Sequence, residues 1–165
     1  MCEVWLCKEW KLAADQPKAA GTVIYPFQPG QVLGVVKYPR KAADFRDQPI
    51  DSGVYTLRYG QQPIDGAHVG TSPTRDFALL LKAADDTAVA PLDYKAMTQK
   101  SAQAAGSAHP LLLSMQRGAG LGEPLSIAHK EEGDWWIVHV QGQTSLNGKT
   151  EKVALEIVVV GKAGE

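Results

Sequence analysis

Two segments that interrupt predicted strands carry side chains that transition metals prefer. The first is QQPIDGAHVGTSPTRDF (61–77), which holds Asp65, His68 and Asp76; the second is GSAHPLLL, which holds His109. Imidazole and carboxylate groups are ligands of zinc, iron and copper. Loops on a rigid sheet are also where functional residues concentrate. We therefore expect a metal site at Asp65, His68, Asp76 and His109, provided that the fold brings the two segments together.

The spacing of these residues favours a structural alternative. The sequence contains no HxH, HExxH or CxxC motif that would place metal ligands side by side. Asp65-Gly66 is a common turn pair, and aspartate and histidine side chains both bond to backbone groups in loops. A purely structural role for these residues is the favoured interpretation, and the metal site is the functional hypothesis.

Arg75 and Trp135 are candidates for ligand binding. Arg75 could bind an anionic ligand, although a tether within the fold is the favoured alternative. Adjacent Trp135 and Trp136 must point to opposite faces of their strand. We expect one, Trp136, in the core beside Val138 and Val140, and the other, Trp135, on the second face. There it could stack on a sugar if it is exposed, although cover by a loop or helix is the favoured interpretation.

Other catalytic signatures are absent from the sequence. There is no GxSxG, no GxxxxGK[ST] and no GxGxxG between a strand and a helix, and GAGLG (118–122) is expected to be a hairpin connection. His129 and His139 lie in predicted strands and are expected to be ordinary half-buried histidines. Cys2 and Cys7 are separated by an odd number of positions in one strand, so they should point to opposite faces and remain unpaired.

Period-two alternation runs through most of the chain and predicts about nine strands. They lie at 2–10, 21–27, 31–38, 53–59, 76–82, 109–117, 122–130, 134–142 and 152–161. Gly34 inside the third strand indicates that another segment approaches it closely. Asn147-Gly148 predicts a tight hairpin. The Ala-rich insertion after the fifth strand predicts one short helix near 91–103, capped by Asp85 or Asp86 and ended by AAG.

These elements predict a single all-β domain over 1–165. An antiparallel β-sandwich with one short helix in an insertion is the favoured architecture, and a β-barrel is the alternative. Free edge strands would allow pairing with a second copy, so a homo-oligomer is one expected arrangement.

The composition limits the classes of partner. Hydrophobic residues make up 44% of the chain, charged residues 21%, and the formal net charge is -1. This balance disfavours nucleic-acid binding, which needs a basic excess. We expect no transmembrane segment, because the longest apolar run, ALEIVVVG, is short and contains Glu156. We also expect no signal peptide within this chain, because residues 1–10 read as a strand.

GVYTLRYG, QPIDGAHVGTSPTRDF and GSAHPLLLS resemble a group of uncharacterised exported bacterial β-sandwich domains. The resemblance spans Gly53 to Leu113 and includes His68 and His109. It implies a periplasmic or extracellular location; a cytoplasmic one is the alternative. The expected function is a binding or structural module of the cell envelope or extracellular space. The alternatives are a metal-binding protein or metal-dependent enzyme, and a carbohydrate-binding module.

Overall fold

Eleven strands and one α-helix form the part of the chain that the structure describes. The structure is a computed structural model, and it describes residues 2–14, 23–62, 74–118 and 120–163. In chain order the elements are β1 (Glu3–Leu6), β2 (Glu9–Lys11), β3 (Val32–Tyr38), β4 (Ala42–Ala43), β5 (Pro49–Ile50), β6 (Gly53–Gln61), β7 (Asp76–Lys82), α1 (Tyr94–Ala105), β8 (Leu112–Gln116), β9 (Leu125–Lys130), the short 3-10 helix η1 (Glu131–Gly133), β10 (Trp135–Leu146) and β11 (Lys149–Val160).

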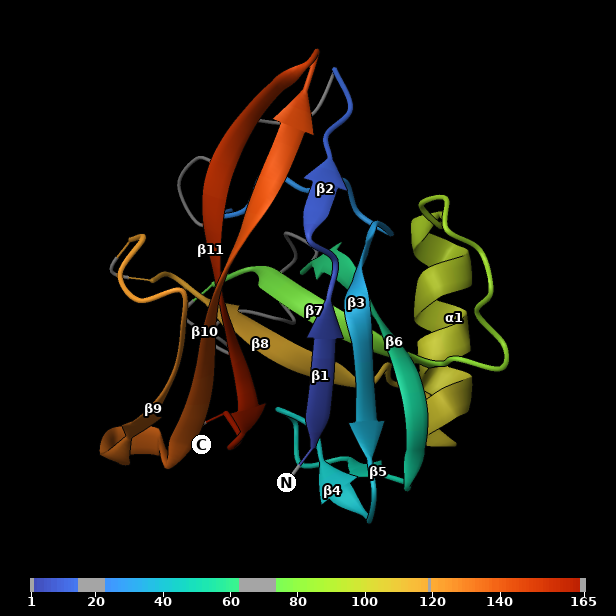
Figure 1. Ribbon diagram of the computed structural model, residues 1–165. Coiled ribbons are helices and arrows are strands. Elements are labelled where there is room, and N and C mark those ends of the chain that lie inside the picture. Colours follow the sequence, from blue (N-terminus) through green and yellow to red (C-terminus); the bar gives the residue numbers. More distant parts are fainter. Residues whose placement is uncertain (1, 15–22, 63–73, 119, 164–165) are drawn as a thin grey trace.

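Nine of these strands form one curled sheet. Its order is β1-β3-β6-β7-β8-β11-β10-β2, and β9 pairs with β10 on the same edge as β2, nearer the start of β10. β1 and β2 are consecutive pieces of the N-terminal segment, yet they occupy the two ends of this order (Figure 1). One segment therefore joins both ends of the sheet and curls it into a half-barrel. The all-β prediction is confirmed, with a single short helix in an insertion.

Close backbone approach explains Gly34, as the sequence predicted. A Cβ atom added to Gly34 would lie 2.1 Å from the carbonyl oxygen of Trp5 on β1. β3 shifts its register with β6 by one residue between Val32 and Gly34. The glycine therefore lets β1 pack directly against an irregular point of β3.

Alternation along β7 separates two apolar cores. Ala78 and Leu80 point into the larger core inside the curled sheet. Phe77, Leu79 and Leu81 point to a second core on the opposite face, where Met97 of α1 covers them. α1 lies beside this part of the sheet in Figure 1. Because both faces of β7 are buried, its sequence is apolar at nearly every position.

The helix begins slightly later than predicted. The Asp93 side chain accepts a hydrogen bond from the Ala96 amide at 2.9 Å and caps α1, in place of Asp85 or Asp86. Asp86 instead lies against the sheet and pairs with Arg58. The end is as predicted, because Gly106 adopts a left-handed conformation with φ 62°. Among the described residues, no helix is long and apolar enough to cross a membrane.

The predicted strand at 21–27 is wrong for its described part. Val23 forms an isolated bridge, and the following residues form no strand. The Asp76 carboxylate accepts hydrogen bonds from the backbone amides of Ile24 and Tyr25 at 3.0 and 3.2 Å. The amides of Ile24 and Tyr25 therefore donate to the Asp76 side chain and are not available to pair with a neighbouring strand.

The hairpin at Asn147-Gly148 is confirmed. Both residues have positive φ, 50° and 78°, as a tight two-residue turn requires. β10 and β11 pair along their length, with one register shift next to Trp136. The predicted first strand is split, because its end leaves β3 and pairs with β10 as β2.

Candidate ligand-binding pocket

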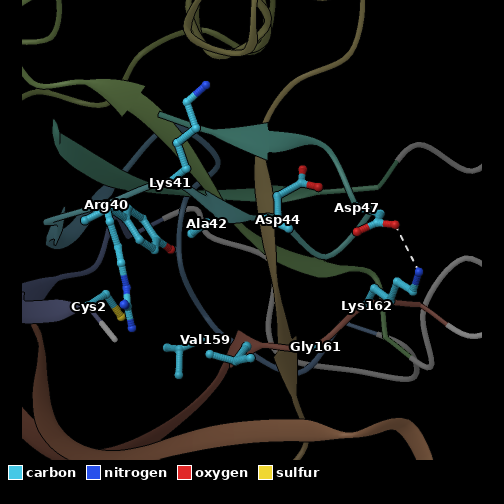
Figure 2. Close-up of a pocket in the computed structure, with 12 residues that line it drawn as sticks. Cys2, Arg40, Lys41, Ala42, Asp44, Asp47, Val159, Gly161 and Lys162 are labelled. Atoms are coloured by element: carbon cyan, nitrogen blue, oxygen red, sulfur yellow. Dashed lines mark hydrogen bonds and ion pairs between the residues drawn. The ribbon is translucent and has the colours of Figure 1, made fainter. Parts of the chain in front are cut away.

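A cavity of about 370 Å³ opens at one end of the half-barrel. It is lined by Cys2, Tyr38, the segment Arg40–Asp44, Asp47 and the segment Val159–Lys162, and we call it the mouth pocket (Figure 2). Cys2 precedes β1, Tyr38 ends β3, and Val160 ends β11. Small-molecule sites often occupy the mouths of curled or closed sheets.

The sheet order explains why a cavity forms here. β1 pairs with β3, whereas β11 pairs with β10 and β8, so β1 and β11 are not bonded to each other. Only the short β2 joins the N-terminal segment to β10, through Glu9, Trp10 and Lys11. At the β1 end of the N-terminal segment the sheet stays open between β1 and β11. The β4–β5 hairpin lies at this opening, where Ala42 and Ala43 line the pocket.

Asp44 fixes the hairpin that forms one wall. Its carboxylate accepts hydrogen bonds from the backbone amides of Arg46 and Gln48 at 2.8 Å each and from the Leu112 amide of β8 at 3.1 Å. The Gln48 side-chain amide adds a fourth bond at 3.2 Å. Burial raises the pKa of Asp44 above its ordinary value, and these hydrogen bonds oppose that rise. Asp44 is therefore a structural group of the wall.

The charged residues that line the mouth pocket are Arg40, Lys41, Asp44, Asp47 and Lys162. Lys162 pairs with Asp47 at 2.9 Å, and Lys41 lies 3.7 Å from Asp51. Within the described part of the chain, Arg40 forms no ion pair. Figure 2 shows Arg40 extending toward Cys2, whereas the Lys41 amine points away from the pocket. Arg40 is thus the cation that the pocket offers to a ligand.

Tyr38 adds a hydrogen-bond donor at the same place. Its side chain is 3% exposed, and its hydroxyl has no hydrogen-bond partner among the described residues. Burial raises the pKa of Tyr38 above its ordinary value, so the hydroxyl stays neutral and can donate. The ring packs edge-on against Tyr55, with centroids 6.1 Å apart, which holds the phenol in place.

Cys2 contributes a protonated thiol. Burial raises the pKa of Cys2, which keeps the thiolate population small at neutral pH. Both Cys2 and Cys7 are free, as their odd separation predicted. Arg40, Tyr38 and Cys2 therefore line one pocket together with apolar residues such as Ala42 and Val159, and this set suits an anionic oxygen attached to a small apolar body.

The predicted metal site is not assembled in the described structure. Asp65 and His68 lie outside the described residues. Asp76 is fully buried, and besides Ile24 and Tyr25 it accepts a hydrogen bond from the Tyr59 hydroxyl at 2.5 Å. Among the described residues, no group of three or more His, Cys, Asp or Glu side chains could hold a metal ion. The Asp76 carboxylate is thus engaged by two backbone amides and a phenol, whereas its predicted role as a metal ligand, which depends on Asp65 and His68, stays a prediction.

His109 instead lines a groove between α1 and the sheet. This groove of about 220 Å³ has Phe77, Leu79 and Leu112 in its lining, with Gln62 and His109 at polar positions. The His109 amide donates to the Ser107 hydroxyl at 3.1 Å, which is a local loop contact. His109 therefore faces a largely apolar groove.

The two predicted ligand-binding residues have structural roles. Arg75 donates from Nε and Nη2 to the Gln62 carbonyl at 2.9 and 2.5 Å, so the favoured alternative of a tether is confirmed. Trp135 is 8% exposed, packs edge-on against Phe45 and donates to the Lys162 carbonyl at 2.7 Å. The favoured alternative, in which another segment covers Trp135, is confirmed, whereas the expectation that Trp136 lies in the core is wrong. Trp136 is the exposed partner at 43%, and its ring stacks on His129.

Sequence reasoning missed Arg40 and Tyr38. Both lie where a strand passes into a segment that was interpreted as a loop, and a lone arginine after Pro39 carries no motif. The Arg40-Lys41 pair was a weak signal of local positive charge. Their place in one pocket depends on the start of β1 and the end of β11 lying beside them, which is a property of the sheet order.

Comparisons with known proteins do not identify a relative. No family model, no curated protein and no solved structure matches this chain. The resemblance to exported bacterial β-sandwich domains stays a prediction.

Proposed function

We propose that this protein is a binding module for small organic anions, and that the mouth pocket is its ligand site. The observation that carries this proposal is that Arg40, which forms no ion pair with a described residue, lines the same cavity as Tyr38, whose buried hydroxyl has no partner among those residues. A carboxylate would accept hydrogen bonds from both groups. The Val159 and Ala42 side chains would contact a short apolar body.

The energetics of Tyr38 favour an occupied pocket. A buried hydroxyl without a partner costs about 1–3 kcal/mol. A ligand oxygen that accepts its proton removes this cost, and a charged acceptor forms the stronger kind of bond. Anion binding therefore offsets a penalty that is built into the free protein.

Binding is a better proposal than catalysis at this site. Cys2 is the nucleophilic side chain of the pocket, and its raised pKa opposes thiolate chemistry. We also propose a location outside the cytoplasm, which the sequence resemblance supports. Cell fractionation followed by detection with an antibody would test it.

Isothermal titration with butyrate tests the proposal, with n-butylammonium as a probe of the same size and opposite charge. We expect butyrate to bind and Arg40→Gln to weaken binding about 10-fold or more, since a hydrogen bond to a charged group contributes about 1.5–3 kcal/mol. Lys149→Gln, in the exposed β10–β11 hairpin, is the matched control and should leave affinity unchanged. Equal butyrate affinity in the wild type and Arg40→Gln would contradict the proposal.

A further inference from the structure

Three polar residues form a row across neighbouring strands, away from the mouth pocket. Ser126 of β9 lies opposite His139 of β10, and His139 lies opposite Glu156 of β11. Directly opposed residues in antiparallel strands project from the same face of the sheet. Ser126, His139 and Glu156 also line one cavity of about 270 Å³, together with Glu123.

The His139 ring is held by one nitrogen and unpartnered at the other. Nδ1 lies 3.2 Å from Oε1 of Glu156. This contact places the proton of a neutral imidazole on Nδ1 and leaves the Nε2 lone pair as an acceptor. Nε2 is buried and has no hydrogen-bond partner in the described structure. A buried acceptor of this kind is stabilised by a ligand that brings an N–H donor.

The charged residues that line the cavity are acidic. Glu123 and Glu156 line the cavity, and no lysine or arginine is among its described lining residues. The Glu156 carboxylate lies close to Gly118, because a Cβ added to Gly118 would be 2.5 Å from its Oε1 atom. A larger residue at position 118 would therefore displace the carboxylate that contacts His139 Nδ1.

We propose that this acidic cavity is a second binding site, which takes a small organic cation with an N–H donor, such as a primary ammonium. The ammonium donates to His139 Nε2 and lies between the Glu123 and Glu156 carboxylates. The cavity is small, so the ligand carries a short apolar body over the Ile137 and Ala128 side chains. The site is independent of the mouth pocket, which has the opposite charge.

NMR of ¹³C-labelled histidine side chains tests this site directly. n-Butylammonium is added at about pH 8, above the ordinary histidine pKa of about 6.5, and n-butanol and butyrate serve as neutral and anionic probes. We expect a saturable shift of the His139 ring signals with butylammonium and a much smaller one with the other two probes. His129 is the internal control, because it also pairs with a carboxylate, Asp134, at 2.7 Å but stacks on exposed Trp136.

Three variants test the geometry. Glu123→Gln should weaken butylammonium binding about two- to five-fold, the effect of one exposed charge. Glu156→Gln should weaken it about 10-fold or more, because it removes the charge and the fixed tautomer. Gly118→Ala should weaken it by displacing the Glu156 carboxylate. No saturable His139 shift, an equal response to butanol, or an equal shift of His129 would overturn the proposal, whatever the result at the mouth pocket.

Discussion

At the scale of single residues, the Tyr38 hydroxyl is expected to lower the stability of the ligand-free protein and to strengthen anion binding. Tyr38→Phe removes a buried hydroxyl that has no partner while keeping the ring against Tyr55. We expect the ligand-free variant to gain about 1 kcal/mol in the free energy of unfolding and to bind butyrate more weakly. Urea unfolding and calorimetric titration measure the two effects. A loss of stability would show that the hydroxyl is already satisfied.

Asp44 predicts a pH dependence at the same scale. Its pKa in the folded state is raised by burial, so the folded protein holds this proton more tightly than the unfolded chain. Its contribution to stability is therefore fully present below the ordinary aspartate pKa of about 3.9 and is lost as the pH rises through the folded value. The unfolding free energy of the wild type minus that of Asp44→Asn should therefore decrease as the pH rises through this range. A difference that grows with pH would contradict this assignment.

At the scale of elements, a buried ion pair holds the segment between β7 and α1 against β6. Arg58 is fully buried and bonds the Asp86 carboxylate through Nε and Nη2 at 2.6 and 2.7 Å. The guanidinium also donates to the carbonyl groups of Gly30, Ala88 and Ala90. The favourable charge pairing lowers the pKa of Asp86 despite the opposing effect of burial.

Arg58→Met should therefore be strongly destabilising. It leaves a buried carboxylate and three carbonyl groups without their donor, and the expected loss is about 3–5 kcal/mol. Lys41→Met is the matched control: its contact with Asp51 is exposed, and the expected loss is below about 1 kcal/mol. Thermal and urea unfolding compare the two variants, and similar losses of stability would argue against a special role of the buried Arg58–Asp86 ion pair.

The elements also show how far sequence reasoning reaches. Alternation and turn chemistry predicted β3, β6, β7, the Asn147-Gly148 hairpin and the glycine end of α1, because these signals are local. The pattern could not show that Asp76 takes the amides of Ile24 and Tyr25, or that Trp135 points inward. The β-bulge next to Trp136 disturbs simple alternation at that point, and the inward face is decided by Phe45, which is remote in sequence.

At the scale of the whole molecule, the N-terminal segment determines the shape of the sheet. It pairs with β3 through β1 and with β10 through β2. Trp10 of β2 is 2% exposed, donates to the Leu33 carbonyl at 3.2 Å and packs on Phe27. One side chain thus fastens the segment to the interior of the curled sheet.

Trp10→Ala should open this connection. We expect a loss of about 3–5 kcal/mol from the large cavity, together with faster hydrogen exchange in the second half of β10, where the Gln143 amide donates to the Lys8 carbonyl. Exposed Trp5→Ala is the control and should be nearly neutral. Unchanged exchange at Gln143 in a destabilised Trp10→Ala protein would show that β2 is held by other contacts.

The central claim is that the open end of the half-barrel binds small organic anions through Arg40. The most direct measurement is the ¹H–¹⁵N spectrum of the arginine side chains while butyrate is added. The account predicts a saturable shift of the Arg40 Nε–Hε signal, with the buried Arg58 signal unchanged. A spectrum in which Arg40 does not respond, or in which Arg46 of the α1 groove responds in its place, would contradict the claim.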